Sequence, residues 1–418
     1  MKKKRVVVTG MGLVSCFGSD IDKFYEKLLN GESGITPIES FDCSEYPTRF
    51  AGEIKKVDHE GYIDKKQARR VDPYILYTMV AGNRAIENAK LDDSKLNKER
   101  VGVIIGSGMG GMHTFENGVH TLTNRGFNRL TPFFIPYVIT NMGGSLLATD
   151  HGYMGPNYSI STACATANYS IVAAANHIRN GEADVMLCGG AEAPLTPVGV
   201  AGFVVIKALS TNNEEPAKAG RPWDKSRDGF VMGEGCGVLV LESLEHAEAR
   251  GATILAEYLG GAYSCDAYHM TSPREDGSGV AVCIENAIKD ANIAPEQINY
   301  VNAHATCTPV GDLCEIRAMK KIFGAHMKNI TINATKPITG HCLGAAAAIE
   351  GIATIKAIQT GKIHPTINCE DPEEEVEGID LVRDGPKEMK ITAAASNSFG
   401  FGGHNSTVIF GPYTNHGK

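Results

Sequence analysis

Short runs of β-branched and other apolar residues alternate along the chain with longer segments whose apolar positions recur at helical spacing. The apolar runs predict strands at Arg5–Thr9, Val101–Ile105, Val185–Gly189, Gly237–Glu242, Ala256–Gly261, Asn299–Asn302, Ile330–Asn333, Ile391–Ser396 and Ser406–Phe410. The helical spacing predicts helices at Asp20–Asn30, Pro73–Ala89, Asn168–Asn180, Leu244–Arg250, Gly279–Ala291, Gly311–Phe323 and Gly344–Thr360. This alternation is typical of α/β proteins in which helices cover largely buried sheets.

The same order of strands and helices occurs twice. The first series ends near Arg250, and the second runs from about Ala256 to Pro412. No residue-level repeat accompanies this order, so the duplication is inferred from the elements alone. We therefore predict two similar halves, residues 1–255 and residues 256–418, without a low-complexity linker between them.

Composition narrows the class of protein. The 418 residues are 43% apolar and 21% charged, which is ordinary for a globular chain with a large core. The net charge of −8 argues against nucleic acid as a general partner. The 11 cysteines include no Cys-x-x-Cys pair, which argues against a disulfide scaffold or a structural zinc site and favours a reducing compartment. No apolar run reaches the roughly 18 residues of a membrane span.

Cys164 is the first candidate for chemistry. It lies among small residues in Ser161–Asn168, directly before an apolar helical segment, so the pattern predicts a tight turn that brings the thiol to a helix N-terminus. The partial positive charge there would lower the thiol pKa and favour the nucleophilic thiolate. The alternative is a buried structural cysteine, a common place for a free thiol.

Two histidines occupy similar places further along the chain. His304 follows a predicted strand within Asn302–Asp312, and His341 follows another within Thr335–Ala348. One histidine at such a turn is more often structural, but two of them amid Gly, Ala and Thr favour catalysis. One thiol with two imidazoles suits decarboxylative carbon–carbon bond formation, because two N–H groups would stabilise the enolate of a malonyl thioester.

A glycine-rich loop in Ser396–Asn405 follows another predicted strand. Glycines let the backbone approach a ligand closely. A backbone N–H of this loop would pair with that of Cys164 as an oxyanion hole for an acyl thioester. A plain glycine turn between two strands is the alternative.

Together and in this order, the four motifs resemble those of the elongating β-ketoacyl-acyl carrier protein synthases and, more distantly, the wider thiolase superfamily. The likeness runs from Arg5 to Ser406 and includes the segments Thr131–Pro136, Arg221–Asp224 and Asp228–Gly235. It implies an α/β, thiolase-like fold in which duplicated βαβαβαββ halves form a five-layer α/β/α/β/α sandwich. The first half would carry the cysteine and the second half both histidines.

The resemblance also implies roles for matching residues. Cys164 would be the acylated nucleophile, and His304 and His341 would bind the malonyl thioester carbonyl. The other implied catalytic residues are Lys336, which would organise the site, and Phe401, whose ring would gate the pocket and whose N–H would complete the oxyanion hole. The supporting acids would be Asp312, Glu315 and Glu350. The substrate contacts would be Thr306 and Thr308 on the phosphopantetheine arm, together with Phe399, Met109, Phe134 and Ile135, the last two across a dimer interface.

The resemblance implies an acyl carrier protein as the partner, loaded with acyl or malonyl groups, and a homodimer. A basic cluster in this acidic chain is the predicted docking surface, extended by Arg129 and Lys207. The full set is Lys65, Lys66, Arg69, Arg70, Arg129 and Lys207. A solvated charged face is the alternative. No redox cofactor or catalytic metal is implied, because the phosphopantetheine arrives on the carrier protein; a monovalent structural cation is compatible with the family.

Two departures from the family pattern stand beside His304. The family sequence Gly-Thr-Ser-Thr is replaced by Ala-Thr-Cys-Thr at residues 305–308, with both threonines retained. Ala305 and the segment Pro132–Tyr137 resemble the plant plastid branch. We therefore expect the protein to be located either in the bacterial cytoplasm or, after loss of a transit peptide, in the plastid stroma.

Three other interpretations explain the sequence less well. A cysteine thioester hydrolase would leave His341 without a role. A catalytically silent partner of the chain-length-factor type would have replaced Cys164. The run Gly10–Ser15 mimics half of a dinucleotide-binding fingerprint, but a packing turn explains it better.

Overall fold

The computed structural model describes residues 3–414. A nine-stranded sheet has the order β4-β5-β6-β1-β7-β13-β12-β8-β9. The strands of the first half are β1 (Val6–Val14), β4 (Val101–Gly106), β5 (Val185–Glu192) and β6 (Gly235–Ser243). Those of the second half are β7 (Ala256–Cys265), β8 (Tyr300–Asn302), β9 (Thr331–Asn333), β12 (Ala394–Gly400) and β13 (His404–Gly411). Two small ribbons pair β2 (Thr36–Pro37) with β3 (Phe50–Ala51) and β10 (Lys362–Ile363) with β11 (Lys387–Glu388).

The strand order repeats on either side of the β1–β7 pair. Moving outward, the first half runs β1, β6, β5, β4 and the second runs β7, β13, β12, β8. Directions agree as well, because β4–β5 and β8–β12 are parallel while the pairs nearer the joint are antiparallel. In the second half β9 follows β8, and in the first half Asn157 bridges Val103 at the matching place. The predicted duplicated α/β architecture is therefore confirmed.

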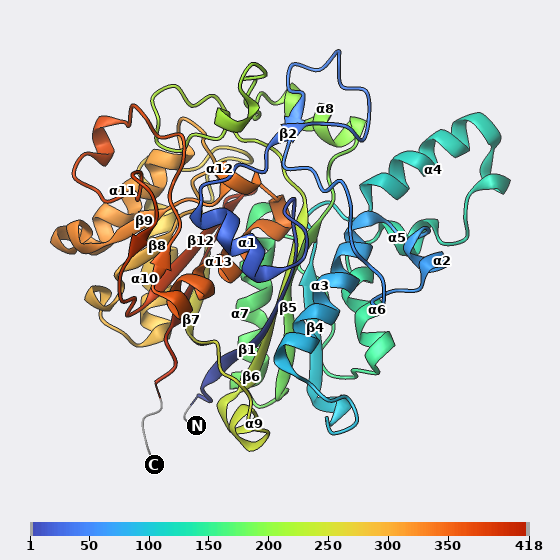
Figure 1. Cartoon of the computed structure of the whole chain (residues 1–418), viewed down its shortest axis with the longest axis horizontal. Helices are drawn as coiled ribbons and strands as arrows, with labels where there is room; N and C mark the ends of the chain where they lie inside the picture. Colours follow the sequence, from blue (N-terminus) through green and yellow to red (C-terminus); the bar gives the residue numbers. More distant parts are fainter. Residues whose placement is uncertain (1–2, 415–418) are drawn as a thin grey trace.

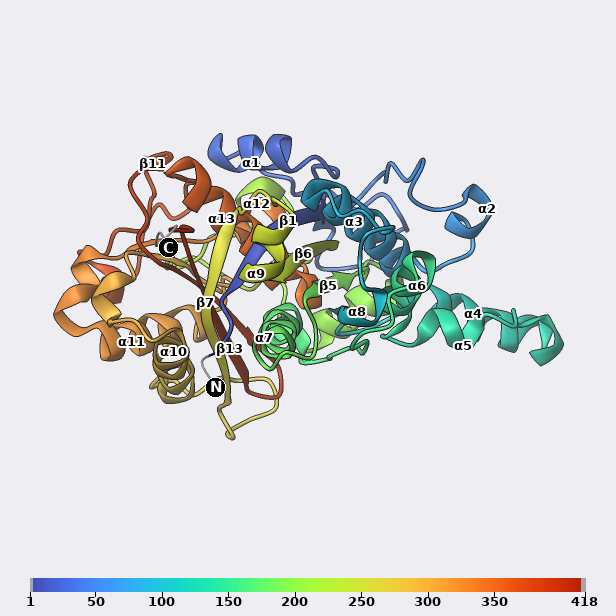
Figure 2. The same cartoon turned by 90° about the horizontal axis from the view of Figure 1, so that it is seen from below.

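Helices form three layers around the two halves of the sheet. The middle layer is α7 (Thr166–Arg179) and α13 (Ala346–Thr360), both of which contact strands of both halves. The outer layers are α3 (Pro73–Ala89) with α6 (Met142–His151), and α10 (Ser278–Ala291) with α11 (Gly311–Phe323). Figure 2 shows the two outer pairs on opposite sides of the sheet. The arrangement is the predicted five-layer α/β/α/β/α sandwich.

Burial on both faces explains why the strands read as continuous apolar runs. In β6, Val238 and Val240 pack in the core under α3, whereas Leu239 and Leu241 pack in the core around the central helices. The local ends of the helices follow equally simple rules. Helix α3 begins after Asp72, whose side chain accepts the Tyr74 N–H at 3.2 Å, with Pro73 at the first helical position.

Several elements were not predicted. They are α4 (Met112–Arg125), α5 (Phe134–Val138), α6, α8 (Pro197–Val205), the four-residue α2 (Lys65–Ala68) and α12 (Lys336–Thr339), and the short strands β2, β3, β10 and β11. The predicted helices at Asp20–Asn30 and Leu244–Arg250 correspond to α1 (Ile21–Leu29) and α9 (Leu244–Ala249). Helices α4 and α5 project from the body of the molecule (Figure 1). No helix among residues 3–414 is long and apolar enough to cross a membrane.

Candidate active site

Cys164 lies in the 3-10 turn Ala163–Ala165, which leads directly into the central helix α7. Ala163 adopts a positive φ of 48°, so the chain turns sharply and presents the half-buried thiol to a cavity of about 410 Å³. The predicted turn at the start of a helix is therefore present. The cavity is lined by side chains from both halves, among them Phe203, Lys207, Phe230, His304, Thr306, Thr308, His341, Phe399 and Phe401.

His304 follows β8 and is held by its backbone. Its N–H donates to Glu315 Oε1 at 3.0 Å, and the next N–H, of Ala305, donates to Glu315 Oε2 at 3.0 Å. The ring Nδ1 lies 3.5 Å from Ser398 Oγ, which itself donates to the carbonyl oxygen of Cys164 at 2.7 Å. The Ser398 hydroxyl thus links the histidine to the cysteine turn.

His341 follows α12 and is locked in place by the segment Asp228–Gly235. Its N–H donates to the Val231 carbonyl at 2.7 Å, and its carbonyl accepts the Gly233 N–H at 2.9 Å. Its ring meets the Phe230 ring edge to face at a centroid distance of 5.2 Å. Both ring nitrogens are buried and have no hydrogen-bond partner among the residues that the structure describes. They are therefore available to a substrate.

The two imidazoles face each other at right angles, with ring centroids 5.5 Å apart. Burial holds the pKa of His304 and that of His341 well below the ordinary value, and the nearby Lys336 ammonium lowers both further. Both rings are therefore neutral at physiological pH. A neutral imidazole carries one N–H, so each ring can donate one hydrogen bond into the cavity.

Lys336 forms a buried ion pair with Glu350, at 2.7 Å between Nζ and Oε1. Burial raises the pKa of Glu350 to about 7, and the Lys336 ammonium opposes that rise. Glu315, the other acid expected near this lysine, accepts from the backbone at residues 304 and 305 and from Asn397 Nδ2 at 3.0 Å. The lysine charge therefore acts on the site while Glu315 holds the histidine loop.

The Cys164 thiol departs from the sequence-based expectation. Burial raises its pKa to about 12, with Lys336 lowering it and Glu192 raising it. The predicted lowering of this pKa at a helix N-terminus is wrong, because removal of the sulfur from water favours the neutral thiol. The resting nucleophile is a neutral thiol.

The loop after His304 is folded around Asp312. One carboxylate oxygen accepts the N–H groups of Cys307 and Thr308, at 3.0 and 3.3 Å, and the other accepts that of Trp223 at 3.1 Å. Burial raises the pKa of Asp312 to about 6, against the attraction of Arg227 at 3.6 Å. The loop places the hydroxyl oxygens of Thr306 and Thr308 3.1 Å apart on the cavity wall.

Both departures from the family pattern fall at unusual backbone conformations. Ala305 has a φ of 32° and Cys307 a φ of 70°. Glycine adopts positive φ without strain, whereas other residues do so at a cost of about 1–2 kcal/mol. Alanine at 305, where the family has glycine, therefore carries strain in the loop that follows the first histidine.

The aromatic residues of the glycine loop line the cavity as expected. The Phe399 ring packs on the His304 ring at 5.3 Å, and the Phe401 ring lies 6.5 Å from the Phe203 ring. A side chain at Gly400 would place its Cβ 3.0 Å from the Cys164 nitrogen. Glycine at this position keeps the space beside the Cys164 N–H open.

The predicted acyl-pocket residues divide into two groups. Met109 packs with Cys164, Phe203 and Leu343 in one apolar cluster. Phe134 and the largely exposed Ile135 lie on α5, on the projecting arm, and do not line the Cys164 cavity. Their part in the acyl pocket stays a prediction that needs a second copy of the chain.

The predicted docking residues are all exposed: Lys65, Lys66, Arg69, Arg70, Arg129 and Lys207. Lys207 follows α8 and borders the Cys164 cavity, whereas the other five lie on or near α2 and the α4–α5 arm. Helix α2 ends at Ala68, so Arg69 and Arg70 lie in the turn after it.

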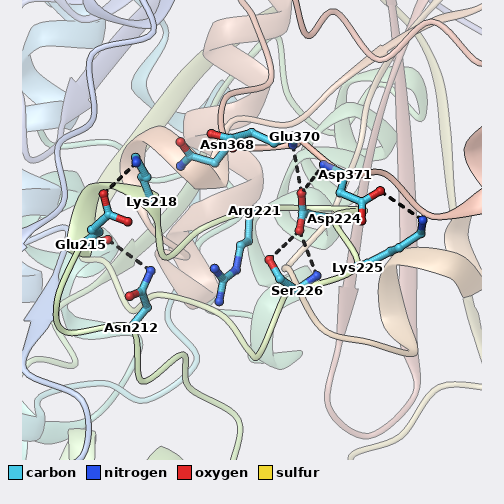
Figure 3. Close-up of a pocket in the computed structure, with 10 residues that line it drawn as sticks. All are labelled: Asn212, Glu215, Lys218, Arg221, Asp224, Lys225, Ser226, Asn368, Glu370 and Asp371. Carbon is cyan, nitrogen blue, oxygen red and sulfur yellow. Dashed lines mark hydrogen bonds and ion pairs between the residues drawn. The ribbon is translucent and has the colours of Figure 1, made fainter.

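A separate polar pocket of about 420 Å³ lies beside the Arg221–Asp224 motif (Figure 3). Asp224 accepts the N–H groups of Glu370 and Asp371 at 2.9 and 2.8 Å, so it ties the acidic loop to the motif. Lys218 pairs with Glu215 and Lys225 with Asp371 at its rim. The motif therefore has a structural role here.

Sequence reasoning missed two residues at the site. Ser398 lies inside the predicted glycine-loop motif, where its hydroxyl was not singled out. Glu192 ends the apolar strand β5 and is fully buried, with its carboxylate against the loop that carries Met109. A single acid at the end of an apolar strand is the sequence feature that would have identified it.

A cavity-facing thiol and two neutral imidazoles, brought together between the halves of a duplicated α/β fold, define a condensing enzyme of the thiolase type. Residues 3–247 match the N-terminal domain of β-ketoacyl synthase, and residues 255–370 match its C-terminal domain. The chain belongs to the β-ketoacyl synthase family.

Relatives with curated functions match nearly the whole chain. The 3-oxoacyl-[acyl-carrier-protein] synthase I, chloroplastic, of Arabidopsis thaliana is 59% identical over 414 residues, covering 98% of this chain and 87% of that protein. The 3-oxoacyl-[acyl-carrier-protein] synthase 2 of Vibrio cholerae is 49% identical over 412 residues, covering 98% and 99%. Among solved structures, a ketosynthase complex with a type II polyketide acyl-carrier protein superposes with a TM-score of 0.92 at 33% identity, covering 99% of this chain and 100% of that one.

Proposed function

We propose that the protein is a 3-oxoacyl-[acyl-carrier-protein] synthase that elongates fatty acyl chains by decarboxylative Claisen condensation. The observation that carries the proposal is the meeting of Cys164 with two neutral imidazoles in one cavity, one of them with both ring nitrogens unpartnered. A hydrolase needs one imidazole as a base, whereas a decarboxylative condensation uses two donors.

In the first half-reaction, the Cys164 sulfur attacks the carbonyl carbon of an acyl thioester on the carrier protein. The new carbon–sulfur bond forms as the bond to the carrier thiol breaks, and the proton lost by Cys164 ends on that leaving thiol. The backbone N–H groups of Cys164 and Phe401 would hold the tetrahedral oxyanion. Gly400 leaves the room this requires beside the first of them.

In the second half-reaction, a malonyl thioester loses carbon dioxide and its electron pair passes into an enolate. The N–H groups of His304 and His341 would donate to the enolate oxygen, and the loss of one such donor typically raises a barrier by about 2.7–4 kcal/mol. The enolate carbon then attacks the acyl carbonyl, and the thiolate of Cys164 leaves and regains a proton. The apolar walls around Phe203, Phe230 and Phe399 keep water from the acyl-enzyme.

The carrier arm would enter along the wall formed by Thr306 and Thr308, whose hydroxyl groups suit the amides of phosphopantetheine. Lys207 stands at the cavity mouth, where a basic side chain suits an acidic carrier protein. The basic residues near α2 and Arg129 complete the proposed docking set. In solved structures, a ketosynthase similar to this chain is found in complex with its acyl-carrier protein.

We also propose a homodimer. The side chains of Phe115, Val119 and Leu122 are 45–49% exposed at helical spacing on α4, and Ile135 on α5 is 61% exposed. Asn157 bridges Val103 at the outer side of β4, and both Asn157 and the following Tyr158 are exposed. A second copy would cover both features and bring Phe134 and Ile135 toward the partner's acyl pocket.

A monovalent structural cation also remains a proposal. Among the buried oxygens without a hydrogen-bond partner in the described range are Asn302 Oδ1, Glu350 Oε2 and Ser396 Oγ. Asn302 and Ser396 are in register on neighbouring strands. Oxygen donors of this kind suit a hard cation, and no step of the reaction depends on it. We propose a plastid stroma or a bacterial cytoplasm as the location of the enzyme, and its chloroplastic and bacterial relatives support this proposal.

The test is a condensation assay with acyl- and malonyl-carrier protein, followed by mass spectrometry of the carrier-bound product. The proposal expects a β-ketoacyl product two carbons longer than the acyl primer. Free fatty acid with free carrier thiol would show a hydrolase instead. A wild-type protein that never acquires an acyl adduct on Cys164 would show a silent partner subunit.

A further inference from the structure

Glu192 receives four hydrogen bonds, which is the full capacity of a carboxylate. Oε1 accepts from Ser107 Oγ at 2.8 Å and from the Met109 N–H at 3.0 Å. Oε2 accepts from the Gly108 N–H at 2.8 Å and from the Gly344 N–H at 2.9 Å. Glu192 is fully buried, and none of the ion pairs formed among residues 3–414 includes it.

The four donors come from both halves of the fold. Ser107, Gly108 and Met109 belong to the loop after β4, and this loop also accepts a hydrogen bond from Ser161 Oγ, at 2.6 Å, through the Ser107 carbonyl. Ser161 lies three residues before Cys164. Gly344 lies three residues after His341, in the 3-10 turn Leu343–Ala345. The carboxylate therefore stands between the chain segments that carry the nucleophile and the second histidine.

Space around the carboxylate is fully used. A Cβ at Gly344 would lie 2.5 Å from Glu192 Oε2 and 2.7 Å from the Gly108 nitrogen. A Cβ at Gly108 would lie 2.8 Å from the same oxygen. Glycines at both positions allow two backbone N–H groups to converge on one oxygen, and a larger residue at either position would require the Glu192 carboxylate or the backbone to move.

A buried carboxylate without a cation is costly unless hydrogen bonds compensate for the lost hydration. Burial raises the pKa of Glu192, and the bonds from Ser107, Gly108, Met109 and Gly344 all oppose that rise. The negative charge also disfavours the Cys164 thiolate. A residue that opposes ionisation of the nucleophile does not serve the site by its charge, so its contribution is geometric.

We propose that Glu192 is a positioning residue that clamps the loop Ser107–Met109 of the first half to the turn after His341 in the second, and so holds His341 in register with Cys164. The inference rests on the proposed function, because the register matters for a reaction that uses both residues. It assigns the second half-reaction as the step that depends on the clamp: acylation needs Cys164 and its oxyanion hole, whereas condensation also needs His341.

The test compares E192Q with the wild type in two separate assays: the rate of Cys164 acylation, followed by intact-protein mass, and kcat for condensation. A glutamine side chain accepts on one oxygen only, so it loses at least one backbone donor. We expect condensation kcat to fall about 10–100-fold, as for a misplacement of about 1 Å, while acylation falls less than about threefold and KM for the malonyl carrier is unchanged.

Glu242 provides the matched control. It is also fully buried and also lies in the first half, but it forms ion pairs with Arg250 and His246. Glu192 lies beside the first residue of β6, whereas Glu242 lies near the last. E242Q should lower stability and leave the ratio of the two rates at its wild-type value. If E192Q does not fold, S107A removes one donor and leaves the backbone unchanged; a fall of about threefold in condensation alone is then expected.

The clamp would be overturned if E192Q lost acylation and condensation equally, or if S107A lost no condensation activity. The proposed function would still stand in either case, provided that the wild type catalyses condensation. A wild type that acylates Cys164 but forms no β-ketoacyl product would overturn the proposed function, and the clamp with it.

Discussion

The two 3-10 turns before the central helices have the same length and begin with the same unusual backbone conformation, but they differ in their side chains. Ala163–Ala165 precedes α7 and Leu343–Ala345 precedes α13. Each begins with a residue at positive φ, 48° for Ala163 and 46° for Leu343. The second residue of the first turn is Cys164, and the second residue of the other is Gly344.

The difference shows how a duplicated fold separates two tasks. In the first turn, a Cβ and its thiol point into the cavity. In the second turn, the Glu192 carboxylate occupies the space that a side chain at residue 344 would fill, and the Gly344 N–H donates a hydrogen bond to it. Three residues before each of these positions stand Ser161 and His341, so the histidine occupies the site that holds a structural serine in the other half. The backbone is shared, and the chemistry lies in single side chains.

Removal of the thiol should have the largest effect on this comparison. C164A leaves the turn intact and removes the acyl acceptor, so condensation should fall roughly a thousandfold or more. Decarboxylation of the malonyl carrier should continue, because both imidazoles remain. The measurement is product mass together with carbon dioxide release. Condensation near the wild-type rate would remove Cys164 from the mechanism.

Adding a side chain to the second turn should have the next largest effect. In G344A, the new Cβ would meet Glu192 Oε2 at 2.5 Å, so the turn must shift and condensation should fall about 10–100-fold. The control is G202A on α8, where nothing lies within 4 Å of the new Cβ. If G344A were as active in condensation as G202A, the second turn would accept a side chain where the first turn has one, and the predicted clash would be wrong.

The ionisation of Cys164 tests how burial affects the side chain of the first turn. Because burial places its thiol pKa at about 12, the thiolate fraction should rise about tenfold per pH unit through the accessible range. Alkylation of Cys164 by iodoacetamide, followed by peptide mass spectrometry, should therefore rise without a plateau between about pH 7 and pH 10. The exposed Cys265 provides an internal reference. A plateau below about pH 8 would show that the helix field prevails over burial.

The smallest expected effect concerns Glu234, whose carbonyl accepts from Cys342 Sγ at the start of the second turn. Burial raises the pKa of the Glu234 carboxyl to about 8 from the ordinary 4.5, so the folded protein binds this proton more tightly than the unfolded chain does. Stability from this group is therefore lost as the pH rises from about 4.5 through 8. E234Q cannot ionise, and its urea midpoint relative to wild type should rise between pH 5 and pH 9. A constant difference between the two midpoints would contradict the shift.

Much of this site could be predicted because its chemistry is local in sequence. Cys164, His304 and His341 each stand among small residues at the end of a strand or start of a helix, and the cavity brings them together. The thiol pKa could not be predicted in this way, since it depends on how much water the other half excludes. Glu192 was missed for the same reason: three of its donors are near in space only after the sheet has formed.

Two of the helices that were not predicted, α4 and α8, lack a sequence pattern with one apolar face toward the core. Helix α4 carries Phe115, Val119 and Leu122 on a face that is exposed in the single chain, so its periodicity has no inward side. Helix α8 is apolar on nearly all sides, so its sequence has no helical periodicity and is typical of a buried apolar segment. By contrast, α3 combines a capping Asp72, Pro73 and one buried face, and its bounds agree with the prediction.

The placement of the four motifs along the chain has a consequence for its biosynthesis. The segment bearing Cys164 leaves the ribosome well before His304 and His341, and the glycine loop with Phe401 leaves last. Because α7 and α13 share the middle layer, the first half emerges without the helix that covers its inner face. A nascent chain therefore exposes an apolar surface but no assembled reaction centre, and condensation becomes possible only when the final β-hairpin, β12 with β13, has docked.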